Sequence, residues 1–327
     1  MKYLYVCVSS EKDFYLEQAF ASIVTLKSKT PNSFVSLLMD EDTGKSLIGG
    51  RENIKNLVDE VVSVEFSPEV SQKVRSRRLK TSMRNLVDGD FLYIDTDTFI
   101  FQDLTELEKL PMSFAGVQDK HCPLSKNDQV HTLSLSKKLL CNQSDFVNEE
   151  MFINSGALLV RDSKENRDFF KDWNNEYQKW EKKGISQDMP SLALVNYKRN
   201  HCISEIDGSW NCQLESGAQF FRSAKIFHYF ASHTKQKSLD DLFLHIRSSK
   251  FDDSAKNYIL ENYERIAFDF GTSALVTGVE QEILKTASYR FLVFLYSRKR
   301  FIFNICEKVF SLGRGKGRYF KSKAVAR

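Results

Sequence analysis

The sequence contains few residues that break regular structure: 5 Pro and 14 Gly stand against 26 Phe in 327 residues. Disordered and low-complexity chains are rich in Pro and Gly and poor in aromatic residues, so this composition argues against both. The chain shows no periodic self-similarity either, which argues against a repeat architecture. Its length suits one large domain with an appendage, or two domains.

The 6 cysteines include no Cys-x-x-Cys pair and no Cys/His cluster with zinc spacing, so the common zinc motifs are excluded. The apolar segment near Met1 is too short for a secretory signal peptide. No run approaches the roughly 20 apolar residues that span a bilayer. We therefore expect a cytoplasmic protein with free thiols, in which the Asn142-Gln143-Ser144 glycosylation sequon is accidental.

The net positive charge of the chain comes from its C-terminal region. Residues 285–327 hold 12 Lys and Arg against one acid, Glu307, whereas the whole chain carries a net charge of only +4. The preceding part is therefore mildly acidic. A basic tail on an acidic body predicts an anionic partner for the tail.

Short apolar runs alternate with amphipathic segments in the first part of the chain. We expect helices over 13–28 and 71–87 and a short one around 44–56, between strands at 3–8, 34–39, 58–66 and 91–94. This alternation predicts βαβ units and a mainly parallel sheet. Later strands are expected at 114–118, 152–160, 202–206 and 225–229, with helices opening near Ser163 and Ile185. The polar stretch 120–148 has the length of a substrate lid.

The strand at 91–94 stops at two carboxylates, Asp95 and Asp97. In an extended segment they point to the same side, because side chains alternate with a period of two. Two anions held so close repel unless a cation lies between them, and a divalent metal carrying phosphate oxygens is the obvious cation. Taken alone, an Asp-x-Asp pair is equally typical of a solvated turn.

Six stretches of the chain follow one another in the order of a known family: Tyr5–Ser10, Arg78–Lys80, Tyr93–Thr98, Phe152–Leu159, Ser186–Asp188 and His228–Tyr229. With these stretches, the chain resembles the GT-A nucleotide-sugar glycosyltransferases from roughly Lys2 to Asp240. It is most similar to family 8, which includes bacterial lipopolysaccharide galactosyl- and glucosyltransferases and glycogenin-like enzymes. The resemblance implies an α/β fold of the GT-A (Rossmann-like) type, with a mixed, mainly parallel sheet flanked by helices in residues 1–240. A helical extension at 241–284 and a helical basic tail at 285–327 would follow.

The resemblance also implies a role for each motif. Asp95, Asp97 and His228 would hold Mn²⁺ or Mg²⁺, and an imidazole ligand favours Mn²⁺. The family retains anomeric configuration, so Asp188 would act as a nucleophile, or Gln187 would stabilise charge in a front-face mechanism. The implied donor-binding residues are Val8, Ser9, Ser10, Arg78, Asp95, Thr96, Asn154, Ser155, Gly156 and Lys235.

Two stretches depart from the family pattern. Ser9 and Ser10 stand where the family commonly has an acid or Asn that holds the uracil. The segment after His228 lacks the family's Gly, Pro and Trp and has its Lys one position late, at Lys235. His233 therefore becomes a rival metal ligand.

Each implied site residue also has an ordinary structural interpretation. His228 can be a core histidine, and Arg78 can lie on a solvated helix face. Lys235 can be a surface lysine, Asn154 to Gly156 a β-bulge, and Asp188 a helix cap. Trp210 and Asn211 can line an acceptor site, although a buried core Trp is the more common case.

The basic tail is also amphipathic. An apolar run over 290–296 leads into Arg298-Lys299-Arg300, and the next apolar residues share one helical side: Phe301, Ile302, Ile305, Val309, Phe310 and Leu312. Basic helices with aromatic residues are typical of interfacial membrane segments. A helix packed on the domain and a nucleic-acid-binding tail are the alternatives. We expect an anionic membrane surface and no nucleic acid, because no nucleic-acid motif is recognisable.

Together these patterns predict a metal-dependent retaining glycosyltransferase, peripheral on the inner face of the cell membrane. It would move a hexose from a UDP-sugar to a glycan or lipid-linked acceptor in cell-surface polysaccharide or lipopolysaccharide synthesis. Two alternatives stay open. A sugar nucleotidyltransferase would also use paired carboxylates and a metal but would release pyrophosphate, and a non-catalytic, membrane-anchored glycan-binding protein would need no metal.

Overall fold

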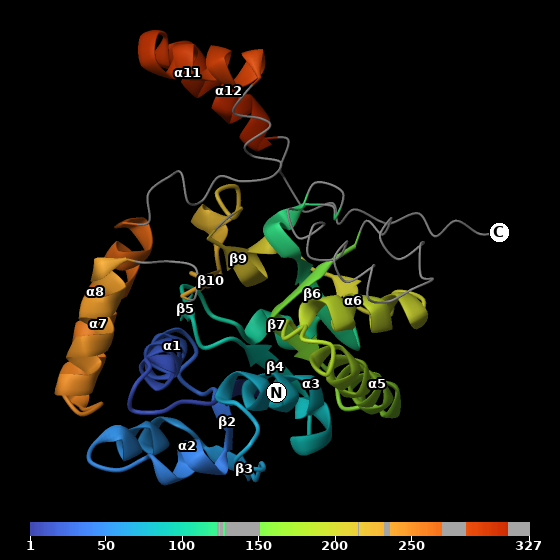
Figure 1. Ribbon diagram of the computed structural model, residues 1–327. Coiled ribbons are helices and arrows are strands. Elements are labelled where there is room, and N and C mark those ends of the chain that lie inside the picture. Colours follow the sequence, from blue (N-terminus) through green and yellow to red (C-terminus); the bar gives the residue numbers. More distant parts are fainter. Residues whose placement is uncertain are drawn as a thin grey trace. The chain divides into compact units, whose positions relative to one another are not determined.

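A seven-stranded sheet, in the order β3-β2-β1-β4-β7-β6-β8, forms the centre of the fold (Figure 1). The pairs β3–β2, β2–β1 and β1–β4 are parallel, whereas β7 runs antiparallel to β4 and β6. The mixed, mainly parallel sheet expected from the sequence is therefore confirmed. Its strands are β1 (Lys2–Cys7), β2 (Phe34–Asp40), β3 (Glu60–Val64), β4 (Phe91–Ile94), β6 (Phe114–Gln118), β7 (Ile153–Val160) and β8 (Ser204–Glu205).

This computed structural model describes residues 1–122, 124, 127, 151–214, 216–231, 236–269 and 286–312. It contains two compact units, 1–279 and 280–327. Most of the expected lid at 120–148 and the sequon at 142–144 lie outside the described residues. Lys235 and the rival ligand His233 lie outside them as well.

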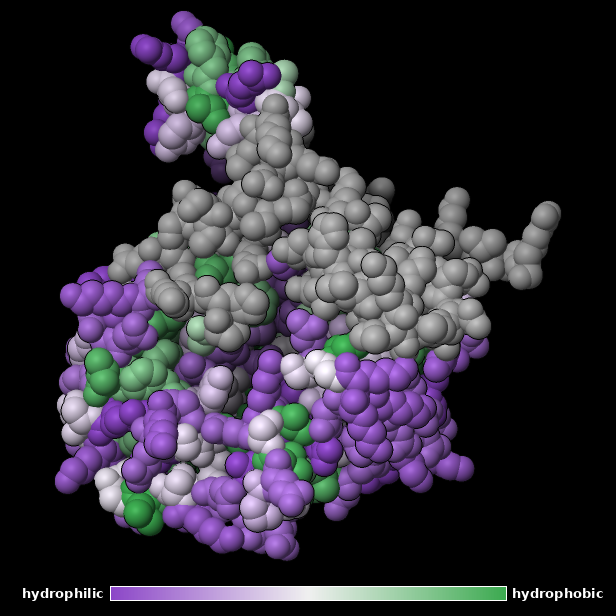
Figure 2. Space-filling view, viewed as in Figure 1, coloured by the Kyte–Doolittle hydropathy of each residue, from purple (hydrophilic) through white to green (hydrophobic). Residues whose placement is uncertain are grey.

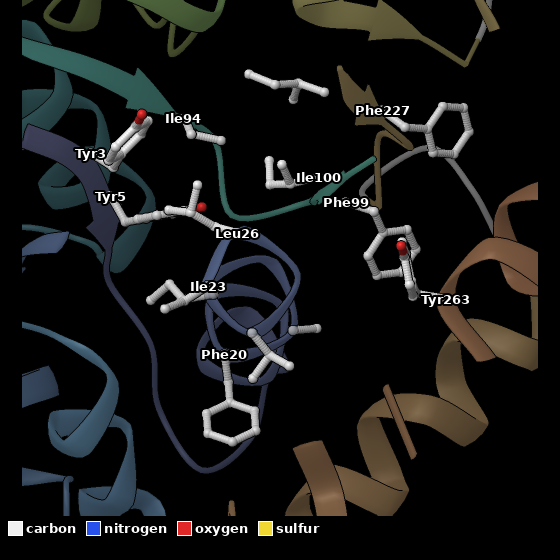
Figure 3. Close-up of a cluster of buried hydrophobic side chains, with 14 of the residues drawn as sticks. Tyr3, Tyr5, Phe20, Ile23, Leu26, Ile94, Phe99, Ile100, Phe227 and Tyr263 are labelled. Carbon is white, nitrogen blue, oxygen red and sulfur yellow. The ribbon is translucent and has the colours of Figure 1, made fainter. Parts of the chain in front are cut away.

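Helices cover both faces of the sheet (Figure 1). Successive side chains of β1 supply both hydrophobic cores, as the two-residue period requires. Tyr3 and Tyr5 lie in the core that contains α1 (Tyr15–Lys29), α7 (Lys237–Ser248) and α8 (Asp253–Asp269). Leu4 and Val6 lie in the core beside α3 (Gln72–Leu86), α5 (Lys164–Glu181) and α6 (Met189–Lys198). Figure 3 shows the first core, where Phe20, Ile23 and Leu26 of α1 lie near Tyr5.

Side-chain caps define two of the expected helices. Ser71 accepts a hydrogen bond from Val74 N at 3.4 Å and begins α3, and Ser163 accepts one from Asn166 N at 3.2 Å and begins α5. The helix expected from residue 13 begins at Tyr15, with Phe14 in the cap position and no side-chain cap bond from it. Asp13 lies just before the helix, where it accepts from Ser10 N at 2.9 Å in the turn after β1 and from Tyr15 N at 3.2 Å.

The short helix expected around residues 44–56 is two elements. Helix α2 (Glu41–Lys45) begins at Asp40, whose carboxylate accepts from Thr43 N at 3.1 Å. A 3₁₀ helix then spans Arg51–Leu57. Gly49 and Gly50 separate the two with φ of 60° and 106°, values that side-chain-bearing residues seldom adopt. Elsewhere in the described part of the chain, 3₁₀ helices span Thr105–Lys109, Asp119–His121, Gly208–Asn211 and Phe221–Ser223.

A second, three-stranded sheet carries the site. Its order is β5 (Thr98–Ile100), β10 (Ile226–His228), β9 (Cys212–Gln213), and β5 pairs antiparallel with β10. Strand β5 begins one residue after Asp97, and β10 ends at His228, with Thr98 opposite His228 in the register. The acidic motif and the histidine therefore meet on neighbouring strands, although they lie far apart in the sequence.

In the unit formed by residues 280–327, the described residues 286–312 form helices α11 (Ala287–Arg298) and α12 (Arg300–Leu312). Leu295 is buried, whereas most large apolar side chains of these helices are exposed, as the hydrophobic patches in Figure 2 show. Among the described residues, no helix is long and apolar enough to cross a bilayer. The exposed apolar residues are Tyr289, Phe291, Leu292, Val293, Phe294, Tyr296, Phe301, Ile302, Ile305 and Val309.

Candidate active site

The two carboxylates of the acidic motif lie in the connection between β4 and β5. Backbone bonds fix this connection, because Asp95 N donates to Gly156 O of β7 at 2.8 Å and Tyr229 N donates to Asp97 O at 3.1 Å. The Asp97 carboxylate accepts from Ala231 N at 3.0 Å. Asp95 and Asp97 are thus held against two distant segments of the chain.

His228 completes a cluster with these carboxylates. Its Nε2 lies 3.2 Å from Asp97 Oδ1 and 4.0 Å from Asp95 Oδ2. One ligand atom from each of the three residues lies within 4.8 Å of the other two. Two hard carboxylate oxygens and one imidazole nitrogen form a donor set that suits Mn²⁺ and also accepts Mg²⁺. The histidine is buried, as a core histidine would be, but its Nε2 faces the carboxylates.

Asp97 is ionised at neutral pH. Burial by itself would raise its pKa, but the charge of His228 and hydrogen bonds from His228 and the Ala231 N–H together lower the pKa to about 2. A carboxylate must be deprotonated to bind a metal ion, so this environment keeps Asp97 ready for ligation.

A third carboxylate, Asp188, lies on the side of Lys80 opposite Asp95. Lys80 Nζ is 3.1 Å from Asp95 Oδ1 and 3.6 Å from Asp188 Oδ2, so one buried ammonium bridges the two acids. Arg77 Nε lies 3.2 Å from Asp188 Oδ1, and Ser155 Oγ donates to Asp188 Oδ2 at 2.7 Å. Negatively and positively charged side chains therefore alternate across the site.

Asp188 occupies the cap position of α6, but its side chain makes no cap hydrogen bond. The carboxylate points instead to Arg77, Lys80 and Ser155. Burial opposes ionisation, yet the charges of Arg77 and Lys80 hold its pKa well below the usual range. Simple capping by Asp188 is therefore excluded, and the site holds an ionised carboxylate.

No family model matches the chain, and no curated protein matches it. Among solved structures, the galactosyltransferase LgtC in complex with donor and acceptor sugar analogs superposes with a TM-score of 0.51 and 13% identity, over 76% of this chain and 96% of that chain. The chain has a GT-A fold.

Two other glycosyltransferases are structurally similar. Mouse xyloside xylosyltransferase 1 in its apo form gives a TM-score of 0.48 at 13% identity, over 72% of this chain and 99% of that chain. Apo GlyE of Streptococcus pneumoniae TIGR4 gives 0.45 at 14% identity, over 82% of this chain and 64% of that chain.

In this GT-A fold, the turn after β1 lies at the same sheet edge as Asp95, because β1 and β4 run parallel. Ser9 N donates to Thr43 Oγ1 at 2.8 Å, and Ser9 Oγ donates to Asp13 at 2.7 Å. Gln72 Nε2 donates to Val8 O at 3.1 Å and thereby connects the turn to α3. The carboxyl edge of a parallel sheet is where α/β folds bind ligands, so this turn is in position to meet one.

The strand motif Asn154 to Gly156 lies beside His228. A register shift in the β6–β7 pairing, between Gly116 and Val117, confirms a bulge here. Gly156 is one of the donor-binding residues that the resemblance implies, and in the structure the ring of His228 lies against it. A Cβ at Gly156 would lie 2.4 Å from His228 Cε1.

The structure places three other predicted residues away from the cluster or at its margin. Arg78 forms two hydrogen bonds to Glu181, at 3.0 and 3.1 Å, and Gln187 is exposed. Thr96 Oγ1 lies 3.5 Å from Gln18 Oε1. Their catalytic and donor-binding roles stay predictions.

The sequence pointed to Arg78, whereas the structure brings its neighbours Arg77 and Lys80 to the carboxylates. Residues three or four apart share one face of a helix, and Arg77, Lys80 and Arg84 follow this spacing in α3. The helical period therefore contained a signal for Arg77 and Lys80. Asn211, which contacts His228, was expected only as an acceptor-site residue. Asp119, which connects to His228 through Asn154 and Asn211, has no comparable sequence signal.

Proposed function

We propose that the chain is a metal-dependent, retaining glycosyltransferase that moves a hexose from a UDP-sugar to an acceptor. The observation that carries this proposal is the cluster of Asp95, Asp97 and His228, at the ligand-binding edge of a sheet with the GT-A fold. Lys80 and Arg77 add positive charge beside it. A nucleoside diphosphate is an anion, and its binding would use both a metal ion held by the cluster and this positive charge.

The cluster fits Mn²⁺ or Mg²⁺, and Asp95, Asp97 and His228 would hold the ion. A bound divalent ion would supply Lewis-acid stabilisation of the departing diphosphate. The chain's own part is to keep the ligands deprotonated and aligned, which the backbone bonds to Asp95 and Asp97 support. The turn at Val8 to Ser10 and the motif Asn154 to Gly156 would contact the donor, and Lys235 would approach its diphosphate.

We propose that the Asp188 carboxylate would lie beside the anomeric carbon of the donor sugar, where positive charge develops during transfer. An ionised carboxylate can attack the anomeric carbon or stabilise its charge, and both routes retain configuration. Arg77 and Lys80 favour the ionised form in either case. Gln187 precedes it and would contact the donor in the front-face route.

We further propose that the acceptor is a glycan or lipid-linked sugar and that residues 285–327 bind an anionic membrane surface. The exposed apolar residues of α11 and α12 are flanked by Arg290, Arg298, Arg300 and Lys308, and this combination is typical of interfacial helices. Such a tail would place the enzyme at the cytoplasmic face of the membrane. There it would take part in synthesis of a cell-surface polysaccharide or lipopolysaccharide.

The reaction can be tested by incubating the full chain with a panel of UDP-hexoses, Mn²⁺ and membrane extract as acceptor. We expect release of UDP and a glycosylated product whose anomeric configuration, read by NMR, matches the donor. Release of pyrophosphate from a sugar phosphate and UTP would instead identify a nucleotidyltransferase. Glycan binding without turnover of any donor would favour a non-catalytic protein.

A further inference from the structure

Four buried side chains form a continuous hydrogen-bonded chain behind the metal cluster, which we call the amide relay. His228 Nδ1 lies 3.1 Å from Asn211 Oδ1, and Asn211 Nδ2 donates to Asn154 Oδ1 at 2.9 Å. Asn154 Nδ2 donates in turn to Asp119 Oδ1 at 2.7 Å. The exposed fractions are 3% for His228 and Asn154, 2% for Asp119 and 0% for Asn211. Buried polar groups depend on such protein partners, so each bond in the relay matters.

The direction of the relay is set at its Asp119 end. The two oxygens of the Asp119 carboxylate accept from the amide nitrogens of Asn154 and Asn127, at 2.7 and 2.9 Å. The Gly156 N–H can only donate, and it reaches Asn154 Oδ1 at 2.9 Å. Asn154 is therefore held with its nitrogen toward Asp119 and its oxygen toward Gly156.

This orientation passes to the histidine. Asn154 presents only an acceptor to Asn211, so Asn211 must turn its nitrogen toward Asn154 and its oxygen toward His228. An amide oxygen cannot donate, so the hydrogen bond requires a proton on His228 Nδ1. The other ring nitrogen, Nε2, is the one that faces Asp97 Oδ1 at 3.2 Å.

We propose that Asn211 and Asn154 are positioning residues that keep the proton of His228 on Nδ1 and leave Nε2 as the metal-binding nitrogen. This inference rests on the proposed metal site. A histidine ligates through a nitrogen that carries no proton, and the partner of the other nitrogen decides which one that is. The relay thereby holds a proton on Nδ1, so the proton that Nε2 shares with Asp97 in the metal-free site is the one that an arriving ion displaces.

The relay also gives Asn154 a role different from direct donor contact. Its oxygen receives two hydrogen bonds and its nitrogen gives one to a carboxylate. Gly156 belongs to the same arrangement, because its missing side chain lets the ring of His228 lie against β7. The strand motif then serves the metal cluster from behind.

The first test reads the ring form directly and needs no metal. The full-length protein is labelled with ¹⁵N-histidine, stripped of metal, and studied by long-range ¹H–¹⁵N NMR. The His228 signals are assigned by their loss in His228→Gln. We expect a proton on Nδ1 in the wild type, and a ring that carries its proton on Nε2 alone would overturn the proposal.

The second test removes the Asn211 oxygen that accepts from His228 Nδ1 and then restores an oxygen at that position. Asn211→Leu removes the oxygen that faces Nδ1, and we expect a mixture of ring forms and Mn²⁺ binding that is weaker by about 10- to 100-fold. Asn211→Asp keeps an oxygen that accepts from Nδ1 and should retain the Nδ1 proton, but it should recover only part of the affinity, because its second oxygen faces Asn154 Oδ1 without a proton to donate. The matched control is Asn166→Leu, which removes a buried Asn that donates to Ser113 O and Arg161 O instead.

Mn²⁺ affinity is measured by electron paramagnetic resonance titration. Wild-type ring form and wild-type affinity in Asn211→Leu would contradict the relay. If the wild type binds no Mn²⁺ at all, the proposed metal function fails. The wild-type NMR spectrum still decides whether the relay sets the ring form, so the two failures are distinguishable.

Discussion

At the scale of single residues, the site depends on which neighbour each charged group has. Lys80 touches Asp95 and Asp188, Arg77 touches Asp188, and His228 touches Asp97. Burying any of these charges alone would be costly, and the pairing removes most of that cost. The same pairing keeps the acids ionised, which is what metal binding and charge stabilisation at a sugar require.

The Asp188 environment predicts a pH dependence of stability. Its pKa is lower in the folded protein than the unfolded value of about 3.9. The ionised carboxylate therefore stabilises the fold above pH of about 4, and this contribution is lost as the pH falls through the folded pKa. We expect the difference in unfolding free energy between metal-free wild type and Asp188→Asn to shrink as the pH falls below about 4.

Denaturant titrations at a series of pH values measure this difference. Asp172→Asn serves as the control, because it removes a carboxylate that is 52% exposed and paired with Arg199 on the surface. A difference for Asp188→Asn that stays constant down to the lowest accessible pH would contradict the electrostatic account.

Gly156 is predicted to tolerate no side chain, for a reason of space and not of backbone conformation. A Cβ there would lie 2.4 Å from His228 Cε1 and 2.7 Å from its Nδ1, so Gly156→Ala must displace the ring. We expect Mn²⁺ binding to weaken by about 10-fold or more, as when a ligand's supporting contacts are lost. In the control, Gly44→Ala, the new Cβ meets Met39 and Ser63 at 3.7 Å, and calorimetry should show unchanged Mn²⁺ affinity.

The sequence predicted the acidic motif, His228 and Asp188 as site residues, and the structure brings them into one site. It could not choose Arg77 over Arg78, because that choice depends on which face of α3 meets the sheet. It also could not reveal that Asn211 reaches His228, because that contact depends on the pairing of β9 and β10. Residues brought together by tertiary contacts of this kind leave no local pattern.

At the scale of elements, most strands and helices followed from apolar periodicity and capping residues. One exception has a local cause: two glycines with positive φ divide the expected helix at 44–56. The domain boundary expected at residue 240 falls within α7, whose apolar residues share a core with α1. The three-part division of the chain stays a prediction.

An ion pair with a buried carboxylate joins α7 to α1. We therefore expect the stability of the fold to depend on this pair. Arg247 Nε donates to Glu17 Oε1 at 2.8 Å, and the Glu17 side chain has no exposed surface. Arg247→Met would leave that carboxylate buried with only Arg51 nearby, at 3.8 Å. We expect the free energy of unfolding to fall by about 3 kcal/mol.

Chemical denaturation measures this loss, and a second substitution checks its cause. Glu17→Gln combined with Arg247→Met removes the buried charge and should recover part of the stability. Lys256→Met breaks a pair with Asp253, which is 89% exposed, and should change stability by less than about 1 kcal/mol. An Arg247→Met protein as stable as wild type would refute a structural role for the pair.

At the scale of the whole molecule, charge and hydrophobicity are divided between two parts. The proposed ligand site of the body lies at a sheet edge rich in paired charges, whereas residues 285–327 combine 12 Lys and Arg with exposed aromatic and aliphatic side chains. Basic residues near an anionic leaflet each contribute about 1 kcal/mol. Such a tail would concentrate an enzyme where lipid-linked acceptors are found.

Deleting residues 285–327 tests the tail. We expect the shortened protein to lose binding to anionic phospholipid vesicles in a flotation assay, while donor hydrolysis in solution persists. Binding of the full chain should weaken with added salt and be small on neutral vesicles, because the attraction is largely electrostatic. Vesicle binding that survives the deletion unchanged would show that the tail is not the membrane contact.

The measurement that tests the central claim most directly is calorimetric titration of UDP with and without Mn²⁺. It should be made on the wild type and on the Asp95→Ala/Asp97→Ala double variant. The account predicts UDP binding that requires Mn²⁺ in the wild type and is lost in the double variant. UDP binding that ignores Mn²⁺ and survives in the double variant, or no UDP binding under either condition, would contradict a metal-dependent donor site at Asp95, Asp97 and His228.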